Sequence, residues 1–235
     1  NEQLAEAIRR YPTRFAGLAA VAPHDPRGAT KEMDRAVRRL GLKGVIVNSH
    51  TRGEMLDDPK FWEIFEAAEA LNVPIYIHPN TPPREMIAPF LPRGLDGAIY
   101  GFAVETGLHL LRIIVAGVFD RFPKLRVVVG HLGEGLPFAM HRLNDHTYRA
   151  AARRGLKRTP LEYLKENLLV TTSGNWYEPA LLCTILALGA DNILFAVDWP
   201  YEPNTAGMAF LKKISISDAD REKIAHGNAE RILRM

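Results

Sequence analysis

Three residues that bind metals in other proteins directly follow short apolar runs rich in β-branched side chains. His78 ends the run IYIH, His131 follows VVVG, and Asp198 follows FAV. Two imidazoles and a carboxylate that converge at one place suit a divalent transition metal, and the carboxylate can also act as an acid or a base. We therefore predict that His78, His131 and Asp198 meet at a site for one divalent metal ion, zinc or manganese.

A glutamate three residues after His131 extends this pattern. In His-x-x-Glu directly after a strand, the carboxylate of Glu134 can reach the imidazole once the following helix begins. It would then fix the tautomer of the imidazole and raise its basicity, as carboxylates do at metal sites and in catalytic dyads. Alternatively, Glu134 is a first-turn helix residue favoured by the helix dipole. The spacing alone leaves both interpretations open.

The other histidines differ in their surroundings. His50 lies just beyond an apolar run, in Asn48-Ser49-His50, so we consider a contact with substrate and a structural role equally. The remaining ones lie in helical or polar stretches and are assigned surface or packing roles: His24, His109, His141, His146 and His226.

The elements that must position these residues are alternating strands and helices. Strands are predicted at 15–22, 43–48, 73–78, 125–129, 168–172 and 193–197, and helices at 30–40, 59–71, 102–119, 135–152, 178–188 and 218–234. The proline-rich segment 79–97 is predicted to be an active-site loop. Strands that are apolar on both faces predict a parallel sheet, whose carboxyl-terminal edge assembles active sites. Both an open doubly wound sheet and an eight-stranded barrel without its first two units fit this order.

Composition narrows the class of protein. The chain has 235 residues, of which 47% are hydrophobic and 24% charged, with a net charge of +3. This balance excludes a disordered chain. The small net charge does not indicate binding to nucleic acid or to a membrane surface, so we expect a small-molecule partner. The one cysteine, Cys183, is predicted to be a buried, inert thiol, which fits a cytoplasmic protein. Because the chain starts without Met inside a helical pattern, we also expect residues upstream of it.

Several motifs together resemble a known group of enzymes. The segments GVIVNSHT, PIYIHP, GHLGEGLPF, TTSGN and FAVDWPYE occur in the order found in the metal-dependent decarboxylases of the amidohydrolase superfamily. These act on hydroxylated benzoates such as γ-resorcylate, 2,3-dihydroxybenzoate, salicylate and 5-carboxyvanillate, and aminocarboxymuconate semialdehyde decarboxylase is more distantly similar. The resemblance implies a (β/α)8 TIM barrel. The chain, 1–235, would supply its strands 3 to 8 as a single domain, without the first two βα units and their Glu-x-His metal motif.

The resemblance also implies roles for individual residues. His78 and Asp198 would be metal ligands, and His131 would lie at the metal or just beside it, paired with Glu134. Residues matching substrate-binding positions are Phe102, Arg142 and Tyr201, and Trp176 and Trp199 fall near the same face. From the sequence alone, we assign Phe102 to the core and Arg142 to the surface as a solvated cation, and the role of Tyr201 stays open. Members of the family commonly form homodimers or homotetramers.

We therefore predict a metal-dependent, non-oxidative decarboxylase of a hydroxylated aromatic carboxylic acid, with Asp198 as the proton donor and His131 and Glu134 relaying the proton or tuning its donor. A metal-dependent hydrolase of an ester, lactone or amide would use the same ligands, and the fold alone does not separate the two. A truncated, inactive barrel module is the third reading, because the first-strand ligands are missing from the chain.

Overall fold

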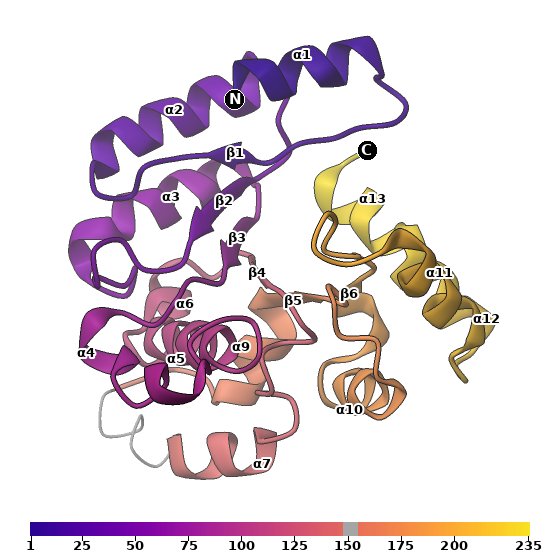
Figure 1. Cartoon of the computed structure of the whole chain (residues 1–235). Helices are drawn as coiled ribbons and strands as arrows, with labels where there is room; N and C mark the ends of the chain where they lie inside the picture. Colours follow the sequence, from indigo (N-terminus) through magenta and orange to yellow (C-terminus); the bar gives the residue numbers. More distant parts are fainter. Residues whose placement is uncertain (148–154) are drawn as a thin grey trace. The chain divides into compact units, whose positions relative to one another are not determined.

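The computed structural model describes residues 1–147 and 155–235 (Figure 1). This part of the chain contains six strands. The strands are β1 (Ala19–Ala20), β2 (Val45–Asn48), β3 (Ile75–His78), β4 (Val127–Val129), β5 (Leu168–Thr171) and β6 (Ile193–Leu194). They follow one another in chain order in one sheet. The pairs β1–β2, β2–β3 and β5–β6 are parallel. The predicted α/β class with parallel strands is confirmed.

The chain divides into two compact units. The first comprises Asn1–Val127 and Leu233–Met235, and the second comprises Val128–Ile232. Strand β4 begins in the first unit and ends in the second.

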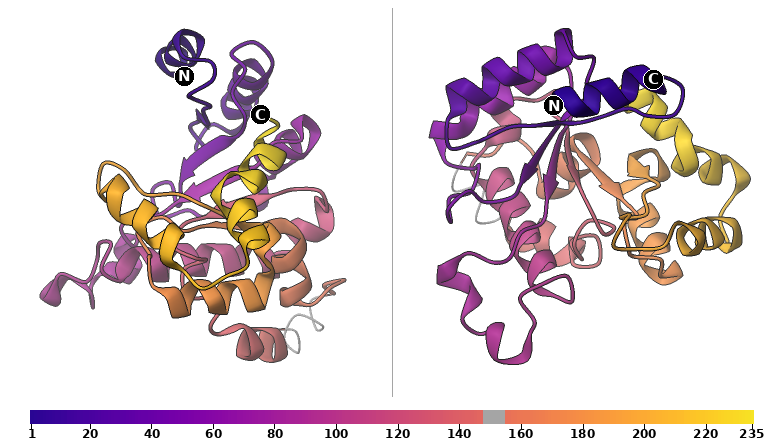
Figure 2. Two further views of the ribbon diagram at one scale, coloured as in Figure 1. Left: turned by 90° about the vertical axis from the view of Figure 1, so that its right-hand side faces the viewer. Right: turned by 45° about the horizontal axis from the view of Figure 1, so that its top comes forward.

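Helices alternate with β1 to β3 in the first unit. They are α1 (Glu2–Arg10), α2 (Pro26–Arg38), η1 (Pro59–Phe61), α3 (Trp62–Leu71), α4 (Arg84–Ile87), η2 (Leu91–Arg93), α5 (Gly101–Val115) and α6 (Val118–Arg121). Helix α2 begins after Asp25, whose carboxylate accepts the N–H of Gly28 at 3.0 Å. Helix α1 lies beside α2 (Figure 2), and an ion pair of 2.7 Å between Glu2 and Arg35 joins them.

The register of β2 and β3 places His78 at the end of the buried part of the first unit. Val45 pairs with Ile75 and Val47 with Ile77, and all four side chains are buried. The pair that follows in the same ladder is Asn48 with His78. Because the strands are parallel, both of these polar residues lie at the carboxyl end, where loops can present them to a ligand.

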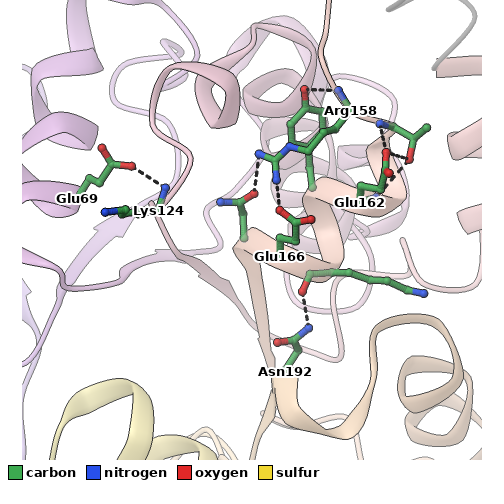
Figure 3. A network of polar contacts seen from close by, with 10 residues as sticks. Glu69, Lys124, Arg158, Glu162, Glu166 and Asn192 are labelled. Carbon is green, nitrogen blue, oxygen red and sulfur yellow. Dashed lines mark hydrogen bonds and ion pairs between the residues drawn. The ribbon is translucent and has the colours of Figure 1, made fainter.

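The second unit contains α7 (Met140–Arg142), η3 (Leu143–Thr147), α9 (Pro160–Asn167), α10 (Glu178–Leu188), η4 (Ala190–Asn192), α11 (Asn204–Lys213), α12 (Asp218–Glu222), η5 (Lys223–Gly227) and most of α13 (Asn228–Leu233). Helix α9 starts with a capping box, in which the hydroxyl of Thr159 accepts the N–H of Glu162 and the carboxylate of Glu162 accepts the N–H of Thr159. The guanidinium of Arg158 lies 4.5 Å from the ring centre of Tyr163 and pairs with Glu166 (Figure 3).

The structure differs from the predicted elements in several places. The strand predicted at 15–22 is wrong for most of its length, because only Ala19–Ala20 pairs with β2 and Phe15 is exposed. The helix predicted at 135–152 begins only at Met140, and residues 148–152 lie outside the described ranges. Helices α9 and α11 were not predicted. The segment 79–97 contains the short helices α4 and η2.

The helices were compared with the length and hydropathy of membrane-spanning helices. Within residues 1–147 and 155–235, no helix combines the length and the apolar character that crossing a bilayer requires.

Candidate active site

A left-handed turn after β4 brings Glu134 back onto His131. Residues His131, Leu132, Gly133, Glu134 and Gly135 have φ angles of 50°, 59°, 85°, 56° and 77°. The N–H of Gly133 donates to the carbonyl of Gly130 at 2.8 Å. Of the two interpretations open for Glu134, the structure shows the contact with His131, and a left-handed turn makes it and not the first turn of a helix.

This turn holds side chains in a conformation that L residues rarely adopt. Three of its members carry a Cβ, and each left-handed residue of that kind costs about 1–2 kcal/mol. At Gly133 a Cβ would also come within 3.1 Å of Pro137 and 3.2 Å of Val170, so glycine is required there. Strain of this kind is retained where the surrounding structure enforces it, which is common at functional sites.

His131 stands between two carboxylates in the second unit. Its Nδ1 lies 2.7 Å from Oε1 of Glu134, and its Nε2 lies 3.9 Å from Oδ2 of Asp198. A carboxylate can only accept, so Nδ1–H donates to Glu134 and Nε2 faces Asp198. The Glu134 side chain is 2% exposed, whereas His131 and Asp198 are 29% and 31% exposed. Solvent and small ligands can therefore reach the edge of the imidazole that faces Asp198.

The two carboxylates change the acidity of His131. Burial alone would lower the pKa of the imidazole, but the hydrogen bond and negative charge of Glu134, together with the charge of Asp198, outweigh it and raise the pKa above its ordinary value. The pair with Glu134 thus favours the protonated imidazole. A proton can be held at Nε2, next to Asp198.

The backbone after β6 fixes the position of Asp198. Asp198 has a φ of 78°, and its carbonyl accepts the N–H groups of Tyr201 at 2.9 Å and Glu202 at 3.0 Å. On the other side, a Cβ on Gly174 would lie 3.7 Å from Oδ2 of Asp198. The carboxylate is therefore held between the loops that follow β5 and β6.

His78 is prepared in a similar way within the first unit. Its Nδ1–H donates to the carbonyl of Pro79 at 2.8 Å, so Nε2 carries the free lone pair. The side chain is half-buried. Histidines that bind metals usually donate their other ring N–H to a carbonyl or a carboxylate, which fixes the tautomer. His78 and His131 both show this arrangement.

The donor atoms of the second unit can be tested against a metal ion. With bonds of about 2.0–2.2 Å to imidazole nitrogen and carboxylate oxygen, two ligands of one ion can stand up to about 4 Å apart. The separation of 3.9 Å between His131 and Asp198 satisfies this limit. Across residues 1–147 and 155–235, no group of three or more His, Cys, Asp or Glu side chains is assembled for a metal. The chemistry of this pair and of His78 fits zinc or manganese.

The structure places the other predicted site residues as follows. His50 is half-buried, and both of its ring nitrogens are engaged: Nδ1 accepts the N–H of Gly53, and Nε2–H donates to the carbonyl of Thr81, each at 3.0 Å. Phe102 is half-buried near the start of α5. Arg142 is exposed at the end of α7, and Tyr201 is 83% exposed in the turn after Asp198.

The two tryptophans near the strand ends differ in exposure. Trp199 is exposed. Trp176 keeps its indole N–H buried, and that N–H finds no hydrogen-bond partner in the described structure.

An apolar cavity of about 450 Å³ opens beside His131. Its walls are mainly carbon, from Leu132, Pro137 and Phe138 on one side and Pro179 and Ala180 on the other. Cys183 also lines it and is half-buried, whereas a buried thiol was predicted. Cavities of this size and character bind small molecules with apolar surface.

A buried polar cluster in the first unit was missed at the sequence level. Ser49, Glu105, Thr106 and His109 are each at most 1% exposed. The packing role assigned to His109 is confirmed, but the partners were not foreseen. The only signal was a glutamate and a histidine four residues apart, which places them on one face of an otherwise apolar helix.

Burial makes the stability of the first unit depend on pH. Burial, with the charge of Arg112, lowers the pKa of His109 from 6.5 to about 3. Between those values the unfolded chain binds a proton that the folded chain does not. The free energy of unfolding is therefore complete above about pH 6.5 and falls with acidification by up to about 1.4 kcal/mol per pH unit. Urea unfolding at pH 7 and pH 5 should show this loss.

The loss should shrink in His109→Gln, which removes the titrating group, and persist in His24→Gln, which removes an exposed histidine. Burial raises the pKa of Glu105, so this residue changes the free energy of unfolding with pH in the opposite direction. It does so in all three proteins. An equal loss in wild type and His109→Gln would contradict the assignment.

Comparison with known proteins gives consistent matches over the whole chain. The sequence model of the amidohydrolase family matches residues 1–235. The γ-resorcylate decarboxylase of Polaromonas sp. (strain JS666) is 37% identical over 244 aligned residues, which cover 100% of this chain and 75% of the relative.

Solved structures agree with these matches. The 5-carboxyvanillate decarboxylase of Sphingomonas paucimobilis has a TM-score of 0.96 at 39% identity, covering 100% of this chain and 71% of that one. The 5-carboxyvanillate decarboxylase of Novosphingobium aromaticivorans, solved with manganese and 4-hydroxy-3-methoxy-5-nitrobenzoic acid, has a TM-score of 0.96 at 42% identity, covering 100% and 68%. The predicted amidohydrolase-type fold is thereby confirmed, with six strands of the barrel among the described residues.

Proposed function

Because the chain belongs to the amidohydrolase family, we propose that it is a metal-dependent, non-oxidative decarboxylase of a hydroxylated benzoate. The observation that carries this proposal is the arrangement of His131 between Glu134 and Asp198. Decarboxylation of an aromatic acid needs a proton delivered to a ring carbon, and this arrangement holds a proton next to a carboxyl group. The γ-resorcylate and 5-carboxyvanillate decarboxylases that match the whole chain support the same reaction.

The reaction balances without an oxidant or a reductant. A proton is added to the ring carbon that carries the carboxylate, which interrupts the aromatic ring. The bond between that carbon and the carboxylate then breaks, its electron pair restores the aromatic ring, and carbon dioxide leaves. The enzyme must therefore supply one proton at one carbon and hold the ring in place while it does so.

We assign these tasks to individual residues. Asp198 donates the proton at Oδ2, and His131 resupplies it from Nε2, 3.9 Å away. Glu134 holds His131 in orientation through Nδ1. His78 and Asp198 would hold the metal ion, with His131 at the ion or just beside it. When bound, the ion stabilises negative charge on the phenolate and carboxylate oxygens of the substrate.

The substrate is proposed to lie on the face formed by the strand ends. The cavity beside His131 offers apolar surface for part of an aromatic ring or its substituents. Phe102 and Tyr201 would flank the ring, and Arg142 would orient the carboxylate. His50 would reach the substrate only by releasing a backbone partner.

The proposal extends to the domain organisation, the localisation, the oligomeric state and the partner of the protein. We place residues 1–235 in one catalytic barrel domain, in a cytoplasmic enzyme that works as a homodimer or a homotetramer. Its partner is a small aromatic carboxylate.

The test is a panel of hydroxybenzoates incubated with the purified protein and manganese or zinc. We expect at least one of γ-resorcylate, 2,3-dihydroxybenzoate, salicylate and 5-carboxyvanillate to release carbon dioxide. Esters and lactones are assayed in parallel. Hydrolysis of these without carbon dioxide from any benzoate would replace the proposal by a hydrolase, and protein that binds no metal would point to an inactive module.

A further inference from the structure

We propose that Glu105 is a positioning residue for the reaction: with Ser49, Thr106 and His109 it forms a clamp that holds the ends of β2 and β3 and thereby orients His78. These four residues are called the Glu105 clamp below. The inference rests on the proposed function, because it takes His78 to be a metal ligand. It adds residues that neither the motifs nor the proposed mechanism includes.

The hydrogen bonds of the clamp have only one consistent direction. The N–H of Leu56 donates to Nε2 of His109 at 2.8 Å, so the proton of the neutral imidazole is on Nδ1. Nδ1–H then donates to Oγ of Ser49 at 2.8 Å, and the hydroxyl of Ser49 donates to Oε1 of Glu105 at 2.6 Å. Thr106 donates to the other oxygen of Glu105 at 3.1 Å. Every polar atom of this chain of bonds has a partner.

The clamp grips both strands that flank the His78 position. Ser49 directly follows Asn48, the residue that pairs with His78 in the parallel ladder. The backbone of Asn80, two residues after His78, also favours the charged carboxylate of Glu105 and so opposes the rise in its pKa that burial causes. Glu105 therefore reaches from α5 to the residue after β2 and to the loop after β3. The ring of His50, bonded to the carbonyl of Thr81, joins the same two loops a second time.

The conformation of Ser49 is a second, independent sign that its hydroxyl is needed. Ser49 has a φ of 33°, in the left-handed region that glycine adopts without strain. A serine at such a position carries a conformational penalty of about 1–2 kcal/mol that glycine would avoid. The hydroxyl is the one group that links Glu105 to His109. Apolar side chains would fill this space without a buried charge or backbone strain. The buried carboxylate of Glu105 and the strained, buried Ser49 therefore indicate a role besides packing.

Glu105→Gln is the first test, because the amide keeps the size of the side chain but presents N–H groups to donors. We expect the manganese dissociation constant of the full chain to rise about 10- to 100-fold, as measured by titration followed by electron paramagnetic resonance. In the metal-free protein, the ¹⁵N signals of the His78 ring, assigned by comparison with His78→Gln, should change from one tautomer to a mixture. The second readout needs neither metal nor substrate.

Arg112→Gln is the matched control. Arg112 lies on the same helix and pairs with Asp57 through two bonds of 2.9 Å, next to Leu56 but outside the clamp. It should leave the His78 signals and the manganese affinity unchanged. If Glu105→Gln folds and also leaves both unchanged, the clamp is packing alone and the proposal is overturned.

Milder variants keep the test decisive if Glu105→Gln does not fold. Thr106→Val removes one donor and leaves Glu105 in place, and Ser49→Gly removes the hydroxyl while relieving the left-handed strain. Each should shift the His78 signals in the same direction as Glu105→Gln. Unchanged signals in the folded variants would overturn the proposal. A failed benzoate panel would refute the proposed function without altering these spectra.

Discussion

Asp198→Asn is expected to lower carbon dioxide release by about 10³-fold or more, because the amide cannot deliver a proton as the carboxyl group does. Asparagine has nearly the same shape, so the turn that fixes residue 198 through Tyr201 and Glu202 is retained. The amide is also a weaker metal ligand than a carboxylate, so bound metal should fall together with activity. The measurements are single-turnover carbon dioxide release and metal content by atomic absorption.

Asp191→Asn is the control for this experiment. Asp191 is an exposed carboxylate in the same unit, lies in η4 before the start of β6, and pairs with Lys223 at 3.0 Å. Its replacement should change activity less than twofold if the effect at position 198 is specific. Activity within tenfold of wild type in Asp198→Asn would show that another group delivers the proton.

The Asp198 variant tests the site more strictly than it tests the reaction. A hydrolase built on the same ligands would also need Asp198, so both readings predict the loss of activity. The benzoate panel decides between the reactions, and the variant then shows whether Asp198, in the loop after β6, takes part in the reaction that is found.

The ends of β3 and β4 were predictable because the signal is local. The runs IYIH and VVVGH combine β-branched side chains with a histidine at the end, and β3 and β4 end within a residue of the predicted positions. The strand predicted at 15–22 failed for a physical reason. Its first residues, Phe15 and Ala16, are exposed and unpaired with β2, so apolar composition alone did not make a strand.

The orientations of His78 and His131 also depend on a local signal. The partners of Nδ1 lie one residue away at His78 and three residues away at His131, so both orientations are set by neighbours in the sequence. The Glu105 clamp could not be foreseen in this way. Ser49 and His109 are 60 residues apart, and only the packing of α5 against the strand ends brings them together.

The turn after β4 shows a further limit of sequence reasoning. The spacing His-x-x-Glu left a contact and a first-turn helix position both open, and the structure shows the contact. The helix was predicted to begin at Gly135. Gly133 and Gly135 instead allow a run of left-handed residues, and the helix is delayed to Met140. The conformation of a glycine-rich loop depends on what packs around it, here Pro137 and Val170 near Gly133.

His131→Asn is expected to lower the rate constant for carbon dioxide release by about 10²- to 10⁴-fold, the usual contribution of a group that moves a proton. If His131 acts beside the ion and not as its ligand, metal content should remain near that of wild type. A parallel loss of metal would instead make His131 a ligand. Metal analysis of the same sample therefore separates the two roles left open by the spacing of 3.9 Å to Asp198.

Glu134→Gln is the companion variant, and its expected effect has a definite sign. The carboxylate raises the pKa of His131, so a neutral amide should lower that pKa. If protonated His131 supplies the proton, the alkaline limb of the rate profile must move to lower pH, with a loss of about 10- to 100-fold near neutral pH. Recovery of rate on acidification would support the relay. A uniform loss at every pH would show that Glu134 only orients the ring.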